Sequence, residues 1–215
     1  YRVILEGNSK GTAAAIMLGS MLYNQSELIF TVTADNLIEG SEYKDAIIEA
    51  KELAKEGNIV SIGIKPGKAN VNYGYILRQE QNVLKFIEKI KLGNEQNFGY
   101  DDGFLWNSGM LIYRAGDMLN AAKEYAPELY NTCRSAKRRV PAIRRTVKFS
   151  EKVMKDIPEG SIEKFILESK PDIKVVEAHI RWKDVGNVSD LDENTSVSHN
   201  DYVIKNDCDN VTVIN

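Results

Sequence analysis

Residues 42–64 read EYKDAIIEAKELAKEGNIVSIGI, and this stretch decides the fold class. Its first half carries apolar side chains at helical spacing, with charged residues between them, at Tyr43, Ala46, Ile47, Ala50 and Leu53. We expect that helix to end at Gly57. The second half, residues 58–64, is a short and largely apolar run, which predicts a strand buried on both faces. A helix that leads directly into a buried strand is typical of α/β proteins with a largely parallel sheet.

The alternation of helix and strand continues through most of the chain. Residues 27–34, ELIFTVTA, predict a second strand buried on both faces. We expect further strands at 72–78, 82–90, 110–115 and 172–180, and further helices at 11–25, 116–139 and 161–170. The predicted fold is therefore α/β and Rossmann-like, with a mixed, mainly parallel sheet flanked by helices on both faces. Residues 1–190 would form this domain, and residues 191–215 a linker and the start of a β-rich C-terminal segment.

Composition excludes several classes of protein. Among the 215 residues, Lys and Arg total 28 and Asp and Glu total 31, so the net charge is -3. That balance argues against a broad nucleic-acid or anionic-membrane surface. No apolar run has the length of a transmembrane helix and we see no signal peptide, so we expect a cytoplasmic protein without a membrane partner. Cys133 and Cys208 form neither a disulfide framework nor a metal-ligand cluster, which favours a reducing compartment.

Two aspartates stand where α/β sheets bind ligands. Asp35 follows the strand expected at 27–34, and Asp184 comes shortly after the strand expected at 172–180. Ligands of such sheets bind at the carboxyl ends of the strands. Two carboxylates there suit Mg²⁺, which takes few protein ligands and completes its shell with phosphate oxygens. Alternatively, Asp35 forms a turn and Asp184 pairs with a neighbouring cation.

Residues 104–110, FLWNSGM, interrupt a bulky apolar run with Asn107, Ser108 and Gly109. Short polar side chains beside a bare backbone allow a polar ligand to approach closely. A β-bulge or tight bend in a buried strand favours the same residue types. These residues alone leave both interpretations open.

An ordered set of motifs resembles one enzyme family. The chain contains, in order, ILEGNSKGTAAAI, VTADNLI, NYGYI, FIEKI, FLWNSGM, SIEKFILE and WKDVGN. This set is similar to the mannose-1-phosphate guanylyltransferases (GDP-mannose pyrophosphorylases), whose motifs include P-A/S-D-H, G-Y-G-Y-I, F-x-E-K-P, L-W-N-S-G-M, S-I-D-x-x-x-M-E and W-x-D-V-G-S-W. The resemblance extends from about residue 3 to residue 188, and FLWNSGM is its most specific element.

The resemblance implies roles for particular residues. Asp35 and Asp184 would be the catalytic pair that holds Mg²⁺. The sugar phosphate would be bound by Gly74, Glu88, Lys89, Asn107, Ser108 and Gly109, and the nucleotide by Lys10 and Thr12 at the start of the first helix. A strand bulge at Gly74, a solvated edge strand at Glu88 and Lys89, and ordinary helix N-terminal chemistry at Lys10 and Thr12 are the alternative interpretations.

The resemblance also implies an activity. A phosphate oxygen of mannose 1-phosphate attacks the α-phosphorus of GTP, GDP-mannose forms and pyrophosphate leaves, with Mg²⁺ as cofactor. Two alternatives stay open here: a uridylyl- or thymidylyltransferase acting on another hexose 1-phosphate, and a non-catalytic relative that binds sugar nucleotides. We also expect a homodimer, because a sheet edge commonly finds a partner. The family's Gly-rich triphosphate loop has no counterpart in the sequence, and we expect that segment to be missing.

Overall fold

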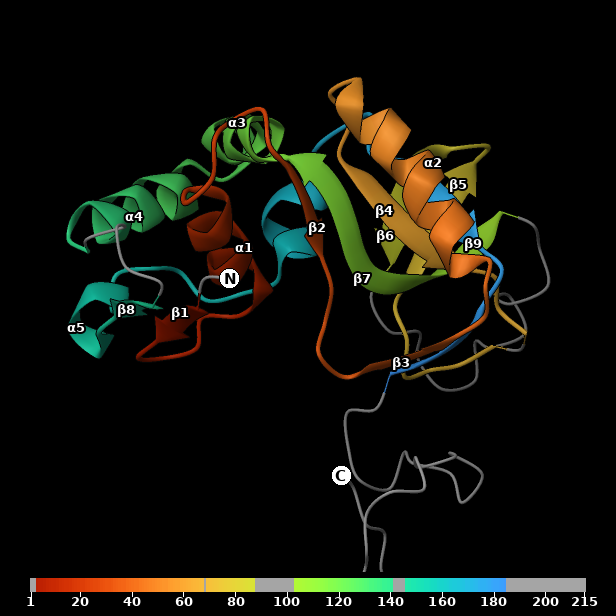
Figure 1. Ribbon diagram of the computed structural model, residues 1–215, viewed down its shortest axis with the longest axis horizontal. Helices are drawn as coiled ribbons and strands as arrows, with labels where there is room; N and C mark the ends of the chain where they lie inside the picture. Colours follow the sequence, from red (N-terminus) through yellow and green to blue (C-terminus); the bar gives the residue numbers. More distant parts are fainter. Residues whose placement is uncertain (1–2, 68, 88–102, 141–145, 185–215) are drawn as a thin grey trace, which may run out of the picture.

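The computed structural model describes residues 3–67, 69–87, 103–140 and 146–184 (Figure 1). Its helices are α1 (Thr12–Ser20), α2 (Tyr43–Lys55), α3 (Ala115–Tyr125), α4 (Pro127–Arg138), α5 (Glu151–Met154) and the π-helical turn η2 (Glu163–Leu167). Its strands are β1 (Val3–Glu6), β2 (Leu28–Thr31), β3 (Asn36–Glu39), β4 (Val60–Ile64), β5 (Tyr75–Gln79), β6 (Asn82–Ile87), β7 (Phe104–Arg114), β8 (Thr146–Phe149), β9 (Lys174–Ala178) and β10 (Arg181–Asp184). None of the helices in this part of the chain is long and apolar enough to cross a membrane.

The largest sheet has six strands in the order β2-β7-β4-β9-β6-β5, and β5 also pairs with β7. The long strand β7 runs antiparallel to β2, β4 and β5. Among the hydrogen-bonded neighbours in the described part of this sheet, only β4 and β9 form a parallel pair. The prediction of a mixed α/β fold is confirmed, whereas the prediction of a mainly parallel sheet was wrong. For β5 and β6 the physical reason is their connection, because β5 returns directly as β6 through a tight hairpin and such a hairpin can join only antiparallel strands.

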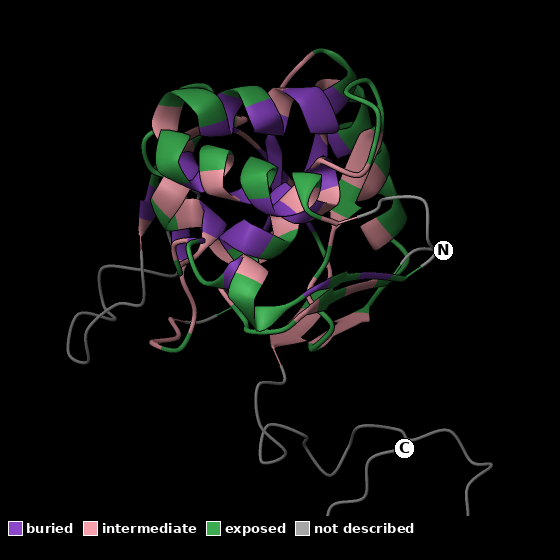
Figure 2. Ribbon diagram, turned by 90° about the vertical axis from the view of Figure 1, so that its left-hand side faces the viewer, coloured by how far each residue is buried: buried purple, intermediate pink, exposed green. Residues whose placement is uncertain are grey.

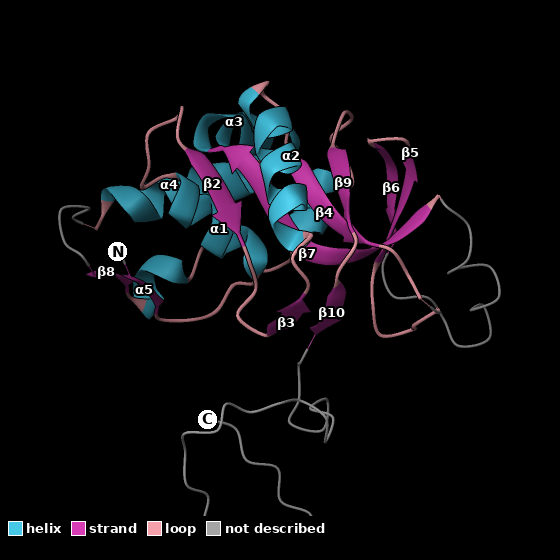
Figure 3. Ribbon diagram, turned by 45° about the vertical axis from the view of Figure 1, so that its right-hand side comes forward, coloured by secondary structure: helices cyan, strands magenta, loops and turns pink. Residues whose placement is uncertain are grey.

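Helices pack on both faces of this sheet. Ala50 of α2 belongs to one hydrophobic core together with Ile62 of β4 and Ile112 of β7. Leu111, the preceding residue of β7, belongs to the second and larger core, which contains residues of α1, α3 and α4. Neighbouring residues join different cores because successive side chains of a strand point to opposite faces. Figure 3 shows α2 in front of β4 and β7, and in Figure 2 the helices carry both exposed and buried residues, as amphipathic helices do.

Strands β2 and β4 differ in burial, although both have apolar sequences. Every residue of β4 is buried, as predicted for residues 58–64. β2 is shorter than the predicted strand at 27–34 and lies at the end of the sheet order. Phe30 is 37% exposed, and Val32, just beyond the strand, is 56% exposed. The prediction of burial on both faces was therefore wrong for β2, because apolar composition does not tell an edge strand from a central one.

Two small sheets complete the described strands. β1 pairs in parallel with β8, and β3 pairs antiparallel with β10. In the second sheet Arg181 lies opposite Glu39, and Asp184 lies opposite Asn36. This pairing joins two motifs that are far apart in the sequence, VTADNLI and WKDVGN.

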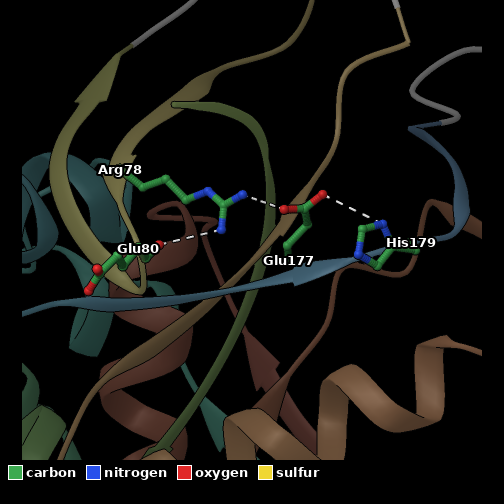
Figure 4. A network of polar contacts seen from close by, with 4 residues as sticks. All are labelled: Arg78, Glu80, Glu177 and His179. Carbon is green, nitrogen blue, oxygen red and sulfur yellow. Dashed lines mark hydrogen bonds and ion pairs between the residues drawn. The ribbon is translucent and has the colours of Figure 1, made fainter. Parts of the chain in front are cut away.

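An ion-pair network links β5 to β9. The guanidinium of Arg78 contacts the carboxylate of Glu177, and its Nη1 donates to the backbone oxygen of Glu80 at 3.4 Å (Figure 4). The other carboxylate oxygen of Glu177 lies 3.5 Å from Nδ1 of His179. The side chains of Arg78 and Glu177 are only 19% and 15% exposed, so removing either partner would leave a poorly solvated charge. The network thereby holds the β5–β6 hairpin against β9.

Candidate functional site

A cavity of about 390 Å³ lies between β5, β6, β7 and η2. The described residues that line it are Gly74, Tyr75, Phe86, Ile87, Asn107, Ser161, Glu163 and Glu168. Gly74 and Asn107, both predicted to bind a sugar phosphate, therefore face one cavity. Glu88 and Lys89 directly follow Ile87 in the sequence, but they lie outside the described residues.

Hydrogen bonds fix the side chain of Asn107 on both sides of its amide group. Its Oδ1 accepts a hydrogen bond from the backbone N–H of Gly109 at 3.2 Å, and its Nδ2 donates to Oε1 of Glu163 at 3.1 Å. Its backbone N–H donates to the backbone oxygen of Gly74 at 2.8 Å. A carboxamide has two donors and an acceptor with two lone pairs, so these contacts orient the group and leave capacity for a ligand.

Ser108 and Gly109 form a bulge in β7. Ser61 of β4 pairs with Leu111 and Gly63 pairs with Asn107, so that β7 uses two more residues than β4 over this stretch. Gly109 has a φ of +72°, a backbone conformation that favours glycine. Ser108 is 4% exposed, and its hydroxyl donates to the backbone oxygen of Ile62. Both residues are absent from the described lining of the cavity, so their geometry matches the bulge interpretation, whereas Asn107 faces the cavity.

The two aspartates come together at one end of the β3–β10 pair. Asp184 lies opposite Asn36, and Asp35 directly precedes Asn36 in an exposed turn. Nδ2 of Asn36 donates to the backbone oxygen of Ser108 at 3.4 Å, which ties this end of β3 to the bulge. The backbones of the two aspartates therefore lie close together, next to the FLWNSGM segment. That their carboxylates share one cation stays a prediction.

Aromatic rings join three of the motifs. The ring of Tyr73 lies 5.1 Å from that of Trp106 and 4.8 Å from that of Trp182, between centroids and in edge-to-face geometry. The two tryptophans are 6.4 Å apart. Because Tyr73, Trp106 and Trp182 are neighbours of Gly74, Asn107 and the aspartate motif in the sequence, their packing holds the segments together.

The N-terminus of α1 is tied to the segment before η2. Gly11, between Lys10 and Thr12, has a φ of +80°, and a Cβ there would lie 2.4 Å from the backbone oxygen of Gly160. The same oxygen accepts a hydrogen bond from the N–H of Ala13 at 3.2 Å. The hydroxyl of Thr12 accepts from the N–H of Ile162 at 3.1 Å, which gives it a structural role. Contacts of Lys10 and Thr12 with a nucleotide stay predictions.

Comparison with known proteins identifies the family. The nucleotidyl transferase family model matches residues 1–200. The chain belongs to the nucleotidyl transferase family. It is 30% identical over 205 residues to a mannose-1-phosphate guanylyltransferase of Escherichia coli, covering 88% of this chain and 43% of that protein. It is 29% identical over 217 residues to a mannose-1-phosphate guanylyltransferase of Salmonella typhimurium, covering 95% of this chain and 45% of that protein.

The chain thus spans less than half the length of these curated relatives. Among solved structures, one described as a mannose-6-phosphate isomerase from Helicobacter pylori matches with a TM-score of 0.78 at 33% identity, over 84% of this chain and 74% of that chain. A mannose-1-phosphate geranyltransferase from Thermus thermophilus matches with a TM-score of 0.72 at 23% identity, over 84% of this chain and 54% of that chain, which supports the fold alone. The resemblance inferred from the motifs is confirmed by these comparisons.

Nucleotidyl transferases generally use a divalent metal ion. In the described part of the chain, no three His, Cys, Asp or Glu side chains gather closely enough to hold a metal ion. A cation beside Asp35 and Asp184 would take few protein ligands and fill its shell with phosphate oxygens. That donor set suits Mg²⁺.

Sequence reasoning missed Glu163 and Glu168 as residues of the candidate site. Both lie in SIEKFILE, where the family motif S-I-D-x-x-x-M-E has acidic residues at the same two positions. That correspondence was the available signal. It could not show that both side chains face the cavity that Asn107 lines.

Two large pKa shifts in the described part of the chain occur away from the cavity. Burial, with a smaller contribution from the nearby charge of Glu6, raises the pKa of the Cys133 thiol to about 12. The pKa of Tyr113 is also raised to about 12, because the effect of burial outweighs the lowering effect of its hydrogen bond with Ser20. Both groups therefore stay protonated near neutral pH, and neither supplies a nucleophile.

Proposed function

We propose that this nucleotidyl transferase transfers a guanylyl group from GTP to mannose 1-phosphate, giving GDP-mannose and pyrophosphate. One observation carries the proposal: Gly74 and Asn107, from motifs far apart in the sequence, line a single cavity. The motif set and the names of the curated relatives support mannose and guanine over other sugars and bases.

The residues of the chain would mainly position the reacting groups. Asn107 offers a carboxamide whose orientation is already fixed by Gly109 and Glu163, so binding a sugar hydroxyl costs little ordering. At Gly74 a Cβ would have Ile87 O at 3.4 Å and Asn107 Cβ at 3.8 Å as its nearest neighbours, so the bare backbone widens the cavity. Lys89 would contact the phosphate of the sugar as a point charge.

The aspartate pair would hold the metal ion beside the cavity. Asp35 and Asp184 would be the protein ligands of a divalent cation, for which we propose Mg²⁺. When bound, the ion would neutralise charge on the phosphate oxygens during in-line transfer. Lys10 and Thr12 would contact the nucleotide, and Ser108 and Gly109 would support the sugar site through the bulge.

The oligomeric state, the cellular location and the domain organisation of the protein are also part of the proposal. We propose a cytoplasmic homodimer with a Rossmann-like domain over residues 1–190. Residues 191–215, which lie outside the described residues, would form a linker and the start of a β-rich C-terminal segment. The short apolar pairs in the last residues of the sequence support such a segment. Sedimentation of the protein with and without residues 191–215 tests whether this segment contributes to the dimer.

A direct assay tests the activity. Full-length protein is incubated with GTP, mannose 1-phosphate and Mg²⁺, and both pyrophosphate and GDP-mannose are quantified. We expect equal amounts of the two products, a preference for GTP over UTP and dTTP, and a preference for mannose 1-phosphate over glucose 1-phosphate. Asp184→Asn should abolish turnover, while Asp172→Asn, at an exposed turn position whose φ of +63° asparagine tolerates, should not.

Two outcomes would contradict the proposal. Binding of the sugar phosphate without pyrophosphate release from any nucleotide would identify a non-catalytic relative. A preference for UTP or dTTP would identify the other transferase class.

A further inference from the structure

The π-helical turn η2 brings two glutamates to one side. The backbone N–H of Glu168 donates to the backbone oxygen of Glu163 at 2.9 Å, five residues earlier. In an α-helix, residues five apart would point about 140° away from each other around the axis. The five-residue hydrogen bond widens the turn, and both glutamates line the same cavity. π-turns of this kind are frequent at functional sites. The conformation of η2 therefore matters for where the two carboxylates lie.

Both glutamates line the cavity that also contains Gly74 and Asn107. Glu163 is half-buried, and its Oε1 accepts a hydrogen bond from Nδ2 of Asn107 at 3.1 Å. That bond uses one of its two carboxylate oxygens and orients the group. Glu168 is exposed and also lines the cavity. Two acceptor groups from one turn thus face the same space.

The chemistry of the described lining favours hydroxyl groups. It carries two carboxylates and, among the described residues, no Lys, Arg or His side chain. An ionised carboxylate only accepts hydrogen bonds, so it pairs with hydroxyl donors and repels a phosphate. Phe86, with its apolar ring, contributes to the wall, and the hydrophobic face of a sugar ring can pack there. A sugar phosphate would therefore bind with its hydroxyls toward η2 and its phosphate away from it.

We propose that Glu163 and Glu168 form a carboxylate clamp that binds two hydroxyl groups of a hexose phosphate. The clamp sets the orientation of the sugar and selects among hexoses by the positions of their hydroxyls. This inference rests on the proposed function in one respect, that the cavity is the sugar site.

Calorimetric titration of the full-length protein tests the clamp. Dissociation constants for mannose 1-phosphate are measured for the wild type, Glu163→Gln and Glu168→Gln, with Glu159→Gln as a matched control at an exposed position outside the described lining. Loss of one charge-assisted hydrogen bond should weaken binding about tenfold in each clamp variant, and the control should change less than about twofold. Binding of inorganic phosphate should not weaken, because the clamp does not contact it.

Monodeoxy analogues of mannose 1-phosphate identify the hydroxyls. The loss caused by Glu168→Gln should disappear for the one analogue that lacks its hydroxyl partner, because that interaction is then already absent. Thermal unfolding of the variants checks that they are folded. If Glu163→Gln is unstable, the binding data of Glu168→Gln are sufficient to test the clamp, because Glu168 is exposed and its substitution should not disturb the fold.

The outcomes separate the clamp from the proposed function. If the wild type binds no hexose 1-phosphate, the proposed function fails. If the wild type binds mannose 1-phosphate and Glu168→Gln binds it equally well, the clamp is wrong and the function stands. The clamp would also be overturned if Glu168→Gln weakened the binding of every monodeoxy analogue equally. It would be overturned as well if the wild type needed a divalent cation to bind mannose 1-phosphate and the glutamine variants did not.

Discussion

Replacing Asn107 by aspartate tests the contact that joins FLWNSGM to η2. Asn107→Asp keeps the oxygen that accepts from the N–H of Gly109, but it places a second carboxylate where Nδ2 now donates to Glu163 at 3.1 Å. A hydrogen bond is lost and two like charges meet. We expect the variant to be less stable at neutral pH and to recover stability in acid.

The magnitude follows from the geometry of the contact. The lost hydrogen bond is worth about 1 kcal/mol. Two charges at 3.1 Å repel by about 1.3 kcal/mol in bulk water and by about 5 kcal/mol at an effective dielectric constant of about 20. Because Asn107 and Glu163 are both half-buried, we take a repulsion of about 2 kcal/mol and a total loss of about 3 kcal/mol. Asn107→Ala, which removes two hydrogen bonds without adding charge, should lose about 1–3 kcal/mol independently of pH.

Urea unfolding of the variants as a function of pH measures these values. Repulsion raises the pKa of the carboxyl pair in the folded state, so stability is present in acid and is lost as the pH rises through that pKa. Adding Glu163→Gln to Asn107→Asp should restore most of the loss, because the glutamine amide can donate to the new carboxylate. If Asn107→Asp is as stable as the wild type, or if the second substitution has no effect, the contact between Asn107 and Glu163 does not exist as described.

Other positions give independent tests of the fold. Burial raises the pKa of the Glu6 carboxyl, so the charged form of this group destabilises the folded state. Glu6→Gln should therefore raise the urea midpoint of unfolding at neutral pH. This gain in stability should vanish when the pH falls below the ordinary carboxyl pKa. Gly11→Ala should cost at least about 2 kcal/mol, because φ is +80° and the Cβ would lie 2.4 Å from the backbone oxygen of Gly160. Gly19→Ala in α1 meets nothing within 4 Å and should gain about 0.5–1 kcal/mol in the same unfolding assay. The thiol of Cys133, with a pKa of about 12, should be alkylated only on unfolding, as peptide mass spectrometry would detect; rapid labelling of the native protein would refute its burial.

Local periodicity predicted the helices and strands better than their arrangement. The apolar spacing from Tyr43 to Leu53 predicted α2, and the apolar run at 58–64 predicted β4, because both signals depend on one element packing on a core. Strand direction depends instead on the connections. The turn at Glu80, with a φ of +53°, makes β5 and β6 a hairpin, and its two central residues, Glu80 and Gln81, are not the glycine or asparagine typical of such turns.

The candidate site was predicted in part, for a similar reason. Gly74 and Asn107 were placed at one site through motif resemblance, which carries information about tertiary contacts that periodicity lacks. Glu163 and Glu168 were missed because five residues is not an α-helical repeat, and only the π-helical turn brings them together. The hydroxyl of Ser108 was expected in the sugar site, yet it points into the protein, because a bulge in a buried strand must satisfy its own polar groups.

A crystal structure of the full-length protein with mannose 1-phosphate tests the central claim most directly. We predict that the sugar lies in the cavity beside Gly74 and Asn107, with hydroxyl groups on Glu163 and Glu168 and the phosphate pointing away from η2. A sugar bound elsewhere, or a phosphate lying against the two glutamates, would contradict it.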